Sequence, residues 1–206
     1  MALKRPLLLW LVPSTPDLPS ASLRAASERY RVVLILRRPH DKAGELRAHL
    51  QRLTAYAREA QAEIGVNCGG VERDEPLAAF IASARELGAT WLQVPERAAQ
   101  EWSGDAGLEH VVRSCHDLAG IDQALRAGAS YCTLSPIFAT PSKPGTPGLG
   151  VEALREASDR YPGKLLALGG VVPEHLDALM AAGAVGVASV RNVPAFITSD
   201  AASNRG

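Results

Sequence analysis

Eight short apolar runs recur along the chain, and this recurrence limits the possible folds more than any other feature. The runs are continuous rather than alternating, which is typical of strands covered on both faces in a parallel sheet. Apolar residues at helical spacing lie between several runs, most clearly over residues 45–60, 77–87 and 173–182. The predicted strands are Leu7–Val12, Val32–Leu36, Glu63–Asn67, Thr90–Val94, Val111–Cys115, Tyr131–Leu134, Leu165–Leu168 and Gly186–Val190. The order predicts strands that alternate with helices.

The joints between helix and strand repeat one design. Leu87-Gly88-Ala89, Ala127-Gly128-Ala129 and Ala182-Gly183-Ala184 each close a helical pattern and precede an apolar run. Glycine after a helix adopts the left-handed conformation that ends it, so three such joints indicate repeated βα units. We therefore predict a single-domain α/β fold, a (β/α)8 TIM barrel over residues 1–197, with a small polar tail over 198–206. An open doubly wound sheet is the alternative, but no G-x-G-x-x-G follows the first run.

The composition describes a globular protein and limits its partners. A length of 206 residues with 47% apolar residues allows one domain with a substantial core. Lys and Arg balance Asp and Glu, and no basic cluster is long enough to follow a nucleic-acid backbone.

Residues 3–12 resemble a signal peptide, but the apolar run ends at Pro13 without a small-residue cleavage site, so a buried strand fits better. No run approaches the ~20 apolar residues of a membrane span. The three widely spaced cysteines indicate neither disulfides nor zinc, and we expect a cytoplasmic protein.

The loops that follow the strands carry function in a barrel of this kind. After the sixth predicted strand, Thr140, Ser142 and Lys143 stand between stiffening prolines, a set of donors that suits a phosphate. An ordinary proline-rich connection would have the same composition. Gly169-Gly170 follows the seventh strand, where backbone N–H groups form the common phosphate cradle of these barrels, and a side chain at Gly170 would obstruct the ligand. The glycine pair favours the phosphate interpretation.

With these residues assembled, the chain resembles the thiamine phosphate synthase family, which also contains thiazole tautomerases. The resemblance covers about residues 7–193. It rests on Ser114-Cys115-His116, Pro136-Ile137-Phe138, Thr140-Pro141-Ser142-Lys143, Ala167-Leu168-Gly169-Gly170, Gly183-Ala184 and Gly186-Val187-Ala188, in that order. The string P-[IV]-F-x-T-x-[ST]-K is the most specific part. The resemblance implies a transferase of thiamine biosynthesis, which joins hydroxymethylpyrimidine pyrophosphate to thiazole phosphate and releases pyrophosphate with Mg²⁺.

The resemblance also implies two groups of site residues. The pyrophosphate group comprises the catalytic candidates Lys143, Arg37 and Ser114, together with Asn67. The thiazole-phosphate group comprises Thr140, Ser142, Gly170 and the backbone at Val190 and Arg191, and we expect Gly169 and His116 to contact substrate as well. His116 could act as an acid or base, but a hydrogen bond to the backbone at the strand end is preferred. Only one of Arg37 and Arg38 is expected to face inward.

The departures from the family concern the metal and the pyrimidine. The two magnesium-binding aspartates align with Cys68 and Ala98, which cannot supply the hard oxygen ligands that Mg²⁺ requires. Ile35 and Pro39 stand where the family has a glutamine that binds the pyrimidine and a lysine. The catalytic histidine of the tautomerases would align with Pro136. We therefore expect a retained thiazole-phosphate site and an eroded magnesium site, with no certain cofactor.

Three functions remain open from the sequence. The first is the synthase reaction, the second is a non-synthase binder or sensor of a phosphorylated thiazole-like ligand, and the third is a thiazole tautomerase with a different base. Glu96 or Asp105, near the fourth loop, could replace a missing magnesium ligand. The expected partner is a small-molecule phosphate or pyrophosphate, without nucleic acid or membrane, and a homodimer is a possible assembly.

Overall fold

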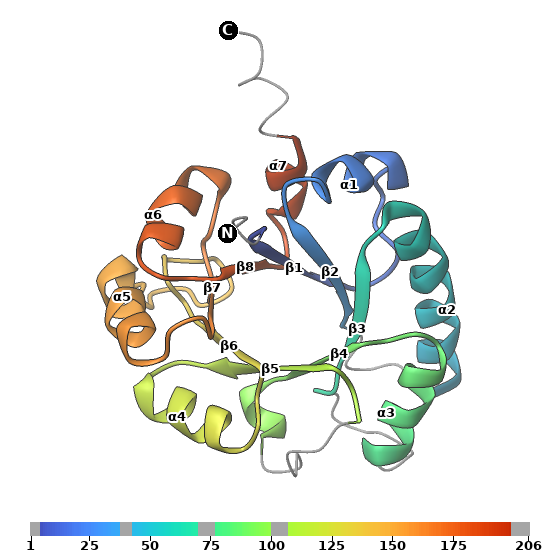
Figure 1. Ribbon diagram of the computed structural model, residues 1–206, viewed down its shortest axis with the longest axis horizontal. Helices are drawn as coiled ribbons and strands as arrows, with labels where there is room; N and C mark the ends of the chain where they lie inside the picture. Colours follow the sequence, from blue (N-terminus) through green and yellow to red (C-terminus); the bar gives the residue numbers. More distant parts are fainter. Residues whose placement is uncertain (1–4, 38–42, 70–76, 100–106, 199–206) are drawn as a thin grey trace, which may run out of the picture.

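Eight parallel strands close into a barrel that helices surround (Figure 1). The computed structural model describes residues 5–37, 43–69, 77–99 and 107–198. Each strand pairs with the next along the chain, and the ring closes where β1 pairs in parallel with β8, with Leu7 opposite Gly186. The predicted (β/α)8 barrel is therefore confirmed.

The elements follow the predicted order, and most strand bounds agree within one residue. The strands are β1 (Leu7–Val12), β2 (Arg31–Leu36), β3 (Glu63–Asn67), β4 (Trp91–Val94), β5 (His110–Cys115), β6 (Tyr131–Leu134), β7 (Leu165–Leu168) and β8 (Gly186–Ser189). The helices are α1 (Ser20–Ala26), α2 (Ala43–Ala60), α3 (Leu77–Glu86), α4 (Leu118–Arg126), α5 (Gly150–Arg160), α6 (Leu176–Ala181) and α7 (Val193–Thr198), with 3-10 turns η1 (Glu96–Ala98) and η2 (Pro173–His175). The three predicted joint glycines, Gly88, Gly128 and Gly183, have φ angles of 93°, 94° and 90°, as a helix-ending glycine should.

Two predicted bounds differ from the structure. The helix expected over residues 173–182 begins as the turn η2, because Pro173 starts it and the backbone N–H of Val172 is held by His175. The last strand ends one residue earlier than predicted, at Ser189, since the N–H of Asn192 turns back to the Ser189 hydroxyl, and Val190 is 45% exposed. Residue 198 ends α7, residues 199–206 lie outside the described residues, and the division into a barrel and a tail stays a prediction.

Apolar side chains on both faces of the strands explain why the runs are continuous. All six residues of β1 are buried, some inside the barrel and some against the helices. The interior is filled by Leu7, Leu9, Leu11, Val33, Ile35, Trp91, Val112, Leu166 and Ala188. Cys68, Cys115 and Cys132 are buried free thiols in the outer layer, between strands and helices. The filled interior leaves space for a ligand at the end of the barrel rather than along its axis.

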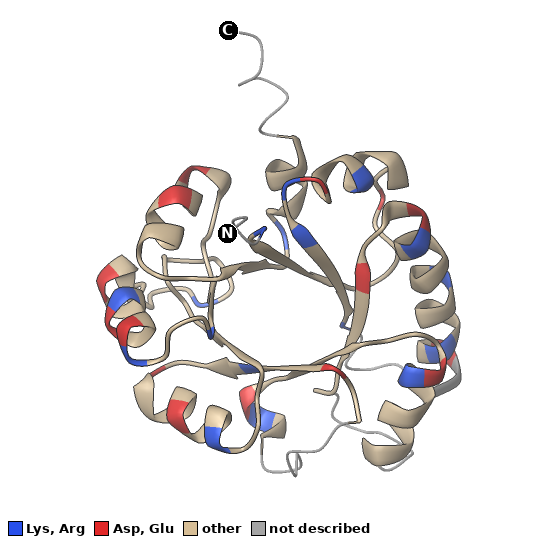
Figure 2. Cartoon of the chain, viewed as in Figure 1, with Lys and Arg blue, Asp and Glu red and all other residues tan. Residues whose placement is uncertain are grey.

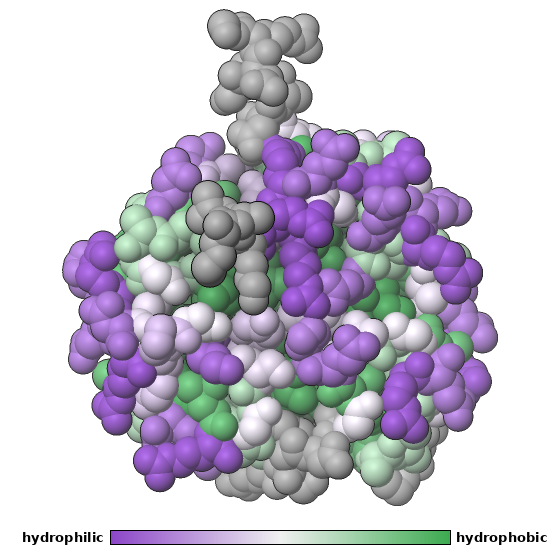
Figure 3. Space-filling view, in the orientation of Figure 1, coloured by the Kyte–Doolittle hydropathy of each residue, from purple (hydrophilic) through white to green (hydrophobic). Residues whose placement is uncertain are grey.

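Charged residues lie mostly on the outer ring of helices (Figure 2). Hydrophilic residues accordingly predominate around the rim of the face in Figure 3. No helix among the described residues is long and apolar enough to span a membrane.

Candidate active site

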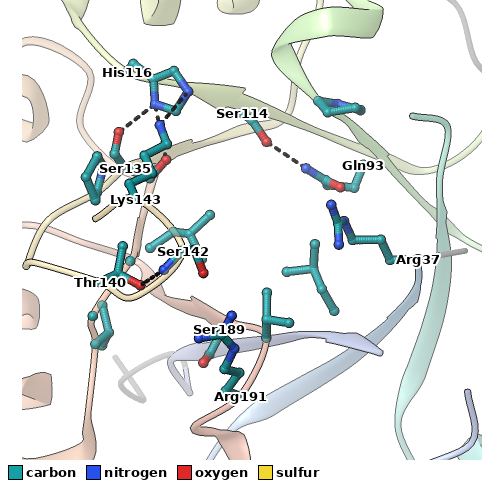
Figure 4. Close-up of a pocket in the computed structure, with 18 of the residues that line it drawn as sticks. Arg37, Gln93, Ser114, His116, Ser135, Thr140, Ser142, Lys143, Ser189 and Arg191 are labelled. Carbon is teal, nitrogen blue, oxygen red and sulfur yellow. Dashed lines mark hydrogen bonds between the residues drawn. The ribbon is translucent and has the colours of Figure 1, made fainter. Parts of the chain in front are cut away.

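A cavity of about 640 Å³ opens at the mouth of the barrel, the end where the carboxyl ends of the strands meet (Figure 4). Its volume is typical of a site for a small molecule. The lining includes every site residue predicted from the sequence: Arg37, Asn67, Ser114, His116, Thr140, Ser142, Lys143, Gly169, Gly170, Val190 and Arg191. Arg38 lies outside the described residues, and Arg37 is the arginine that faces inward. The structure thus brings the predicted residues together, while their roles remain predictions.

Close backbone contact fixes the loop after β7. The N–H of Ile137 donates to the carbonyl of Leu168 at 2.9 Å, and the N–H of Phe138 donates to Gly169 at 3.0 Å. Gly170 has a φ of 65°, and a Cβ atom there would lie 2.5 Å from the carbonyl oxygen of Ala139. The requirement for glycine therefore comes first from the β6 loop that packs against it. From the sequence we expect glycine there for the approach of a ligand, and the contact with the β6 loop is a second reason.

Backbone donors face the cavity from the loops after β7 and β8. In the described part of the chain, the N–H groups of Gly170, Val190 and Arg191 have no protein acceptor. The side-chain amide of Asn192 donates to the carbonyl of Val171 at 2.9 Å and so ties the two loops together. Unpaired N–H groups on a fixed loop are suited to a phosphate oxyanion.

The β6 loop adds donors beside this cradle. Thr140 and Ser142 lie on one side of the cavity, and the N–H of Ser142 donates to the Thr140 hydroxyl at 3.4 Å (Figure 4). The ammonium of Lys143 lies 3.4 Å from Nε2 of His116. The loop therefore presents two hydroxyls and one cation to the same cavity.

The contacts of His116 are compatible with both roles that the sequence left open, namely a hydrogen bond to the backbone and a function as acid or base. Its Nδ1 donates to the carbonyl of Ser135 at 2.6 Å, which is the expected backbone contact. Asp117 caps α4 by accepting from the N–H of Gly120 at 2.7 Å, and this cap fixes the turn that carries the histidine. Because Nδ1 holds a proton, Nε2 is left to face Lys143 and the carboxylate of Glu96, which is 3.2 Å away.

A chain of hydrogen bonds orders the floor of the cavity. The N–H of Gly69 donates to Oδ1 of Asn67 at 2.8 Å, and Asn67 donates through Nδ2 to Oε1 of Gln93. Gln93 donates in turn to the Ser114 hydroxyl at 2.7 Å. Since the oxygen of Ser114 accepts this bond, its own hydrogen can be donated to a ligand. The N–H of Gly69 can only donate, so it sets the direction of this chain of hydrogen bonds, in which Asn67 and Gln93 are only 9% and 3% exposed.

Three contributors were missed by reading the sequence. Gln93 lies within a four-residue strand, and a polar residue inside an apolar run was a signal for it. Ser189 and Arg97 also line the cavity. Arg97 lies in the short turn η1 after β4, where no sequence pattern tells which side chains point inward.

The described residues do not fit a magnesium centre. Cys68 is fully buried and Ala98 is 4% exposed, and both pack in the outer apolar layer instead of lining the cavity. Glu96 is the only carboxylate among the described lining residues, and it contacts His116. No group of three or more His, Cys, Asp or Glu that could hold a metal occurs in the described segments, and Asp105 lies outside them. Mg²⁺ prefers carboxylate oxygens, whereas this cavity offers mainly donors.

Comparisons with known proteins show what the chain is similar to. The family model described as "Thiamine monophosphate synthase" matches residues 13–193. A thiamine-phosphate synthase of Thermosynechococcus vestitus is 33% identical over 110 residues, or 53% of this chain and 31% of that protein. One from Thermus thermophilus is 29% identical over 185 residues, or 89% of this chain and 83% of the relative. The chain thus spans about a third of the first relative and most of the second.

A solved structure is also similar. The structure titled thiamine phosphate pyrophosphorylase from Pyrococcus furiosus has a TM-score of 0.64 and 18% sequence identity, covering 89% of this chain and 85% of the other. At this identity the likeness supports the barrel fold.

Proposed function

The chain belongs to the thiamine monophosphate synthase family, and we propose that it joins hydroxymethylpyrimidine pyrophosphate to thiazole phosphate and releases pyrophosphate. One observation carries the proposal. Two sets of donors line one cavity, with Thr140 and Ser142 on one side and Arg37 and Gln93 on the other (Figure 4). A site for two phosphorylated substrates needs two such sets.

The thiazole phosphate is assigned to the loops after β6, β7 and β8. The N–H groups of Gly170, Val190 and Arg191, which have no acceptor among the described residues, would donate to its oxygens, and the hydroxyls of Thr140 and Ser142 would add hydrogen bonds. Holding the phosphate there orients the attached ring toward the rest of the cavity. Such positioning can supply a large part of the rate of a two-substrate reaction.

The pyrophosphate is assigned to the other set of donors. In the reaction the ring nitrogen of the thiazole forms a bond to the exocyclic carbon of the pyrimidine, while the bond from that carbon to the pyrophosphate oxygen breaks. The bonding electrons leave with the pyrophosphate, whose negative charge increases. Arg37 and Ser114, together with Lys143 from the β6 loop, would stabilise that charge, and Asn67 would orient Ser114 through Gln93.

The direct test is formation of thiamine phosphate from the two substrates, followed by chromatography. We expect formation by the wild type and a loss of at least about tenfold in Lys143→Ala, because a charged hydrogen bond contributes about 1.5–3 kcal/mol. Lys164→Ala is the matched control, since Lys164 is an exposed lysine outside the cavity. Absence of product with the wild type would contradict the proposal.

A tautomerase with a different base is the second candidate, and the geometry of His116 favours it over a passive binder. Nδ1 is fixed on Ser135, so Nε2 could take a proton from a thiazole phosphate held on Gly170. Exchange of a ring-bound hydrogen of thiazole phosphate in deuterated water, lost in His116→Gln, would support this function. Absence of exchange with the wild type would exclude it.

A further inference from the structure

Arg97 lies across the mouth of the barrel, between the loops that follow β3 and β4. Its backbone belongs to η1, and its Nη2 donates to the carbonyl oxygen of Gly69 at 3.0 Å. The side chain lines the cavity. One of the five N–H donors of the guanidinium is used on Gly69, so the others can reach a ligand.

The guanidinium of Arg97 lies beside the two positions at which the family resemblance leads us to expect metal ligands. Arg97 directly precedes Ala98 and Gly69 directly follows Cys68, and the resemblance implies aspartates at the positions of Cys68 and Ala98. The side chains of Cys68 and Ala98 are buried in the outer layer. The same two loops are instead linked by a hydrogen bond from an arginine. We propose that Arg97 replaces the divalent metal as the counter-charge of a diphosphate ligand, so that this chain binds the diphosphate without magnesium.

The charges around Arg97 support an anion rather than a cation. Within the described segments, neither Arg97 nor Arg37 forms an ion pair. Glu96, the neighbouring carboxylate, is directed to His116 at 3.2 Å, so no carboxylate of the described segments pairs with the guanidinium of Arg97. Two guanidinium groups present planar sets of donors, which match the paired oxygens of a diphosphate.

The hydrogen-bonded residues at the floor of the cavity, Asn67, Gln93 and Ser114, also favour a diphosphate. Each amide oxygen in the chain from Gly69 to Ser114 already accepts a hydrogen bond from a protein group. The hydrogens left over are that of the Ser114 hydroxyl and the second hydrogens of the Asn67 and Gln93 amides. A metal ion would need those oxygens as ligands, whereas an oxyanion needs the hydrogens.

Calorimetric titration with inorganic pyrophosphate tests the inference. The inference rests on the proposed function for its choice of a diphosphate. We expect the wild type to bind pyrophosphate in EDTA about as tightly as with Mg²⁺. Arg97→Ala should bind about ten- to a hundredfold more weakly in both buffers, and Arg97→Lys should recover part of the loss because the charge remains.

Two controls separate binding from folding. Arg58→Ala, on the exposed side of α2, should bind pyrophosphate like the wild type. Titration of Arg97→Ala with thiazole phosphate should give the wild-type affinity, because that anion is assigned to the loops after β7 and β8. Pyrophosphate binding that requires Mg²⁺ in the wild type, or that is unchanged in Arg97→Ala, would overturn the inference.

Failure of the proposed role of Arg97 can be distinguished from failure of the proposed synthase reaction. Thiamine phosphate formation that depends strictly on Mg²⁺ would support the synthase and overturn the role of Arg97. Pyrophosphate binding in EDTA that is lost in Arg97→Ala, without any product formation, would support the role of Arg97 and contradict the synthase.

Discussion

The two ends of the barrel interior are both polar, but they use polar groups differently. At the closed end, the first residues of β2 to β6 are Arg31, Glu63, Trp91, His110 and Tyr131, and they contact one another. Glu63 accepts from Nη2 of Arg31 at 2.8 Å and from Nε1 of Trp91 at 2.7 Å. Nη2 of Arg31 also lies 2.9 Å from Nε2 of His110. Charges at this end are satisfied by the protein itself.

At the mouth, the same strands end in groups that are only partly satisfied. Arg37 follows β2, while Asn67, Gln93 and Ser114 lie on β3, β4 and β5. Their hydrogen bonds run in one direction and leave donors at the cavity. The comparison indicates that the closed end contributes to stability and the mouth contributes to binding, as expected for a barrel of this type.

The pKa values of the charged groups at the closed end reflect these contacts. The hydrogen bond to Glu63 raises the pKa of Arg31. Burial raises the pKa of Glu63, but hydrogen bonds from Arg31 and Trp91 outweigh it and hold that pKa below its usual value. Burial, reinforced by Arg31, lowers the pKa of His110. The closed end therefore favours a charged pair beside a neutral histidine.

The largest effect is expected for Gly170→Val at the mouth. The φ of 65° and the carbonyl of Ala139, 2.5 Å from the new Cβ, should displace the loop. We expect thiazole-phosphate affinity to fall by roughly a hundredfold or more, with a stability loss of about 1–3 kcal/mol. Gly145→Ala is the matched control, since Gly145 has a φ of 74° but open space around it. Equal behaviour of the two variants in calorimetry would show that the loop contact does not hold the phosphate site.

Glu63→Gln should affect only the closed end. The amide would place an NH₂ group against Arg31 or Trp91, so the free energy of unfolding should fall by about 1–3 kcal/mol in urea titrations. Glu152→Gln, which alters an exposed ion pair with Arg155, should change it by about 0.5 kcal/mol or less. Pyrophosphate affinity should stay at the wild-type value in both variants. A weakened affinity in Glu63→Gln would mean that the two ends are coupled.

Ser114→Ala should weaken binding at the mouth. Loss of a donor to the anion should weaken pyrophosphate binding by about tenfold, and stability should fall by about 1–3 kcal/mol because the buried Gln93 amide loses its acceptor. Thr133→Val is the control, because Thr133 pairs with Ser114 in the sheet and its buried hydroxyl has no partner among the described residues. If Ser114→Ala bound pyrophosphate as tightly as the wild type, the floor would have no part in binding.

The smallest expected effect is the dependence of Tm on pH. Because the pKa of His110 is lowered in the folded state, the unfolded chain takes up a proton first as the pH falls below 6.5. Tm should therefore drop by a few degrees between about pH 7.5 and 5.5, and His110→Gln should reduce that drop. A further loss is expected below pH 4.5, where Glu63 loses its advantage over the unfolded chain. An identical profile in His110→Gln would remove His110 as the cause.

The barrel could be predicted from the sequence because its signals are local. Continuous apolar runs and glycines such as Gly88 and Gly128 mark strands and joints without knowledge of the tertiary structure. The helix over residues 173–182 was only partly predicted, since its first turn depends on a contact with His175. The pairing of β1 with β8 could be predicted because the sequence contains eight strand runs, the number that closes a barrel of this type. Neither strand alone carries a signal for this pairing.

The candidate site was predictable where a motif specified it. The residues from Thr140 to Lys143 and the pair Gly169-Gly170 all reach the cavity. Arg97 could not be identified, because the orientation of an exposed side chain in an irregular segment depends on the neighbouring Gly69 carbonyl. The clash that makes Gly170 necessary likewise arises between two loops that are distant in sequence.

A crystal structure with thiazole phosphate and inorganic pyrophosphate, grown with EDTA, tests the central claim most directly. We expect the phosphate of the thiazole on the N–H groups of Gly170, Val190 and Arg191, and pyrophosphate between Arg37 and Arg97. Pyrophosphate that appears only after magnesium is added, with a metal ion bound to it and Arg97 turned away, would contradict the account.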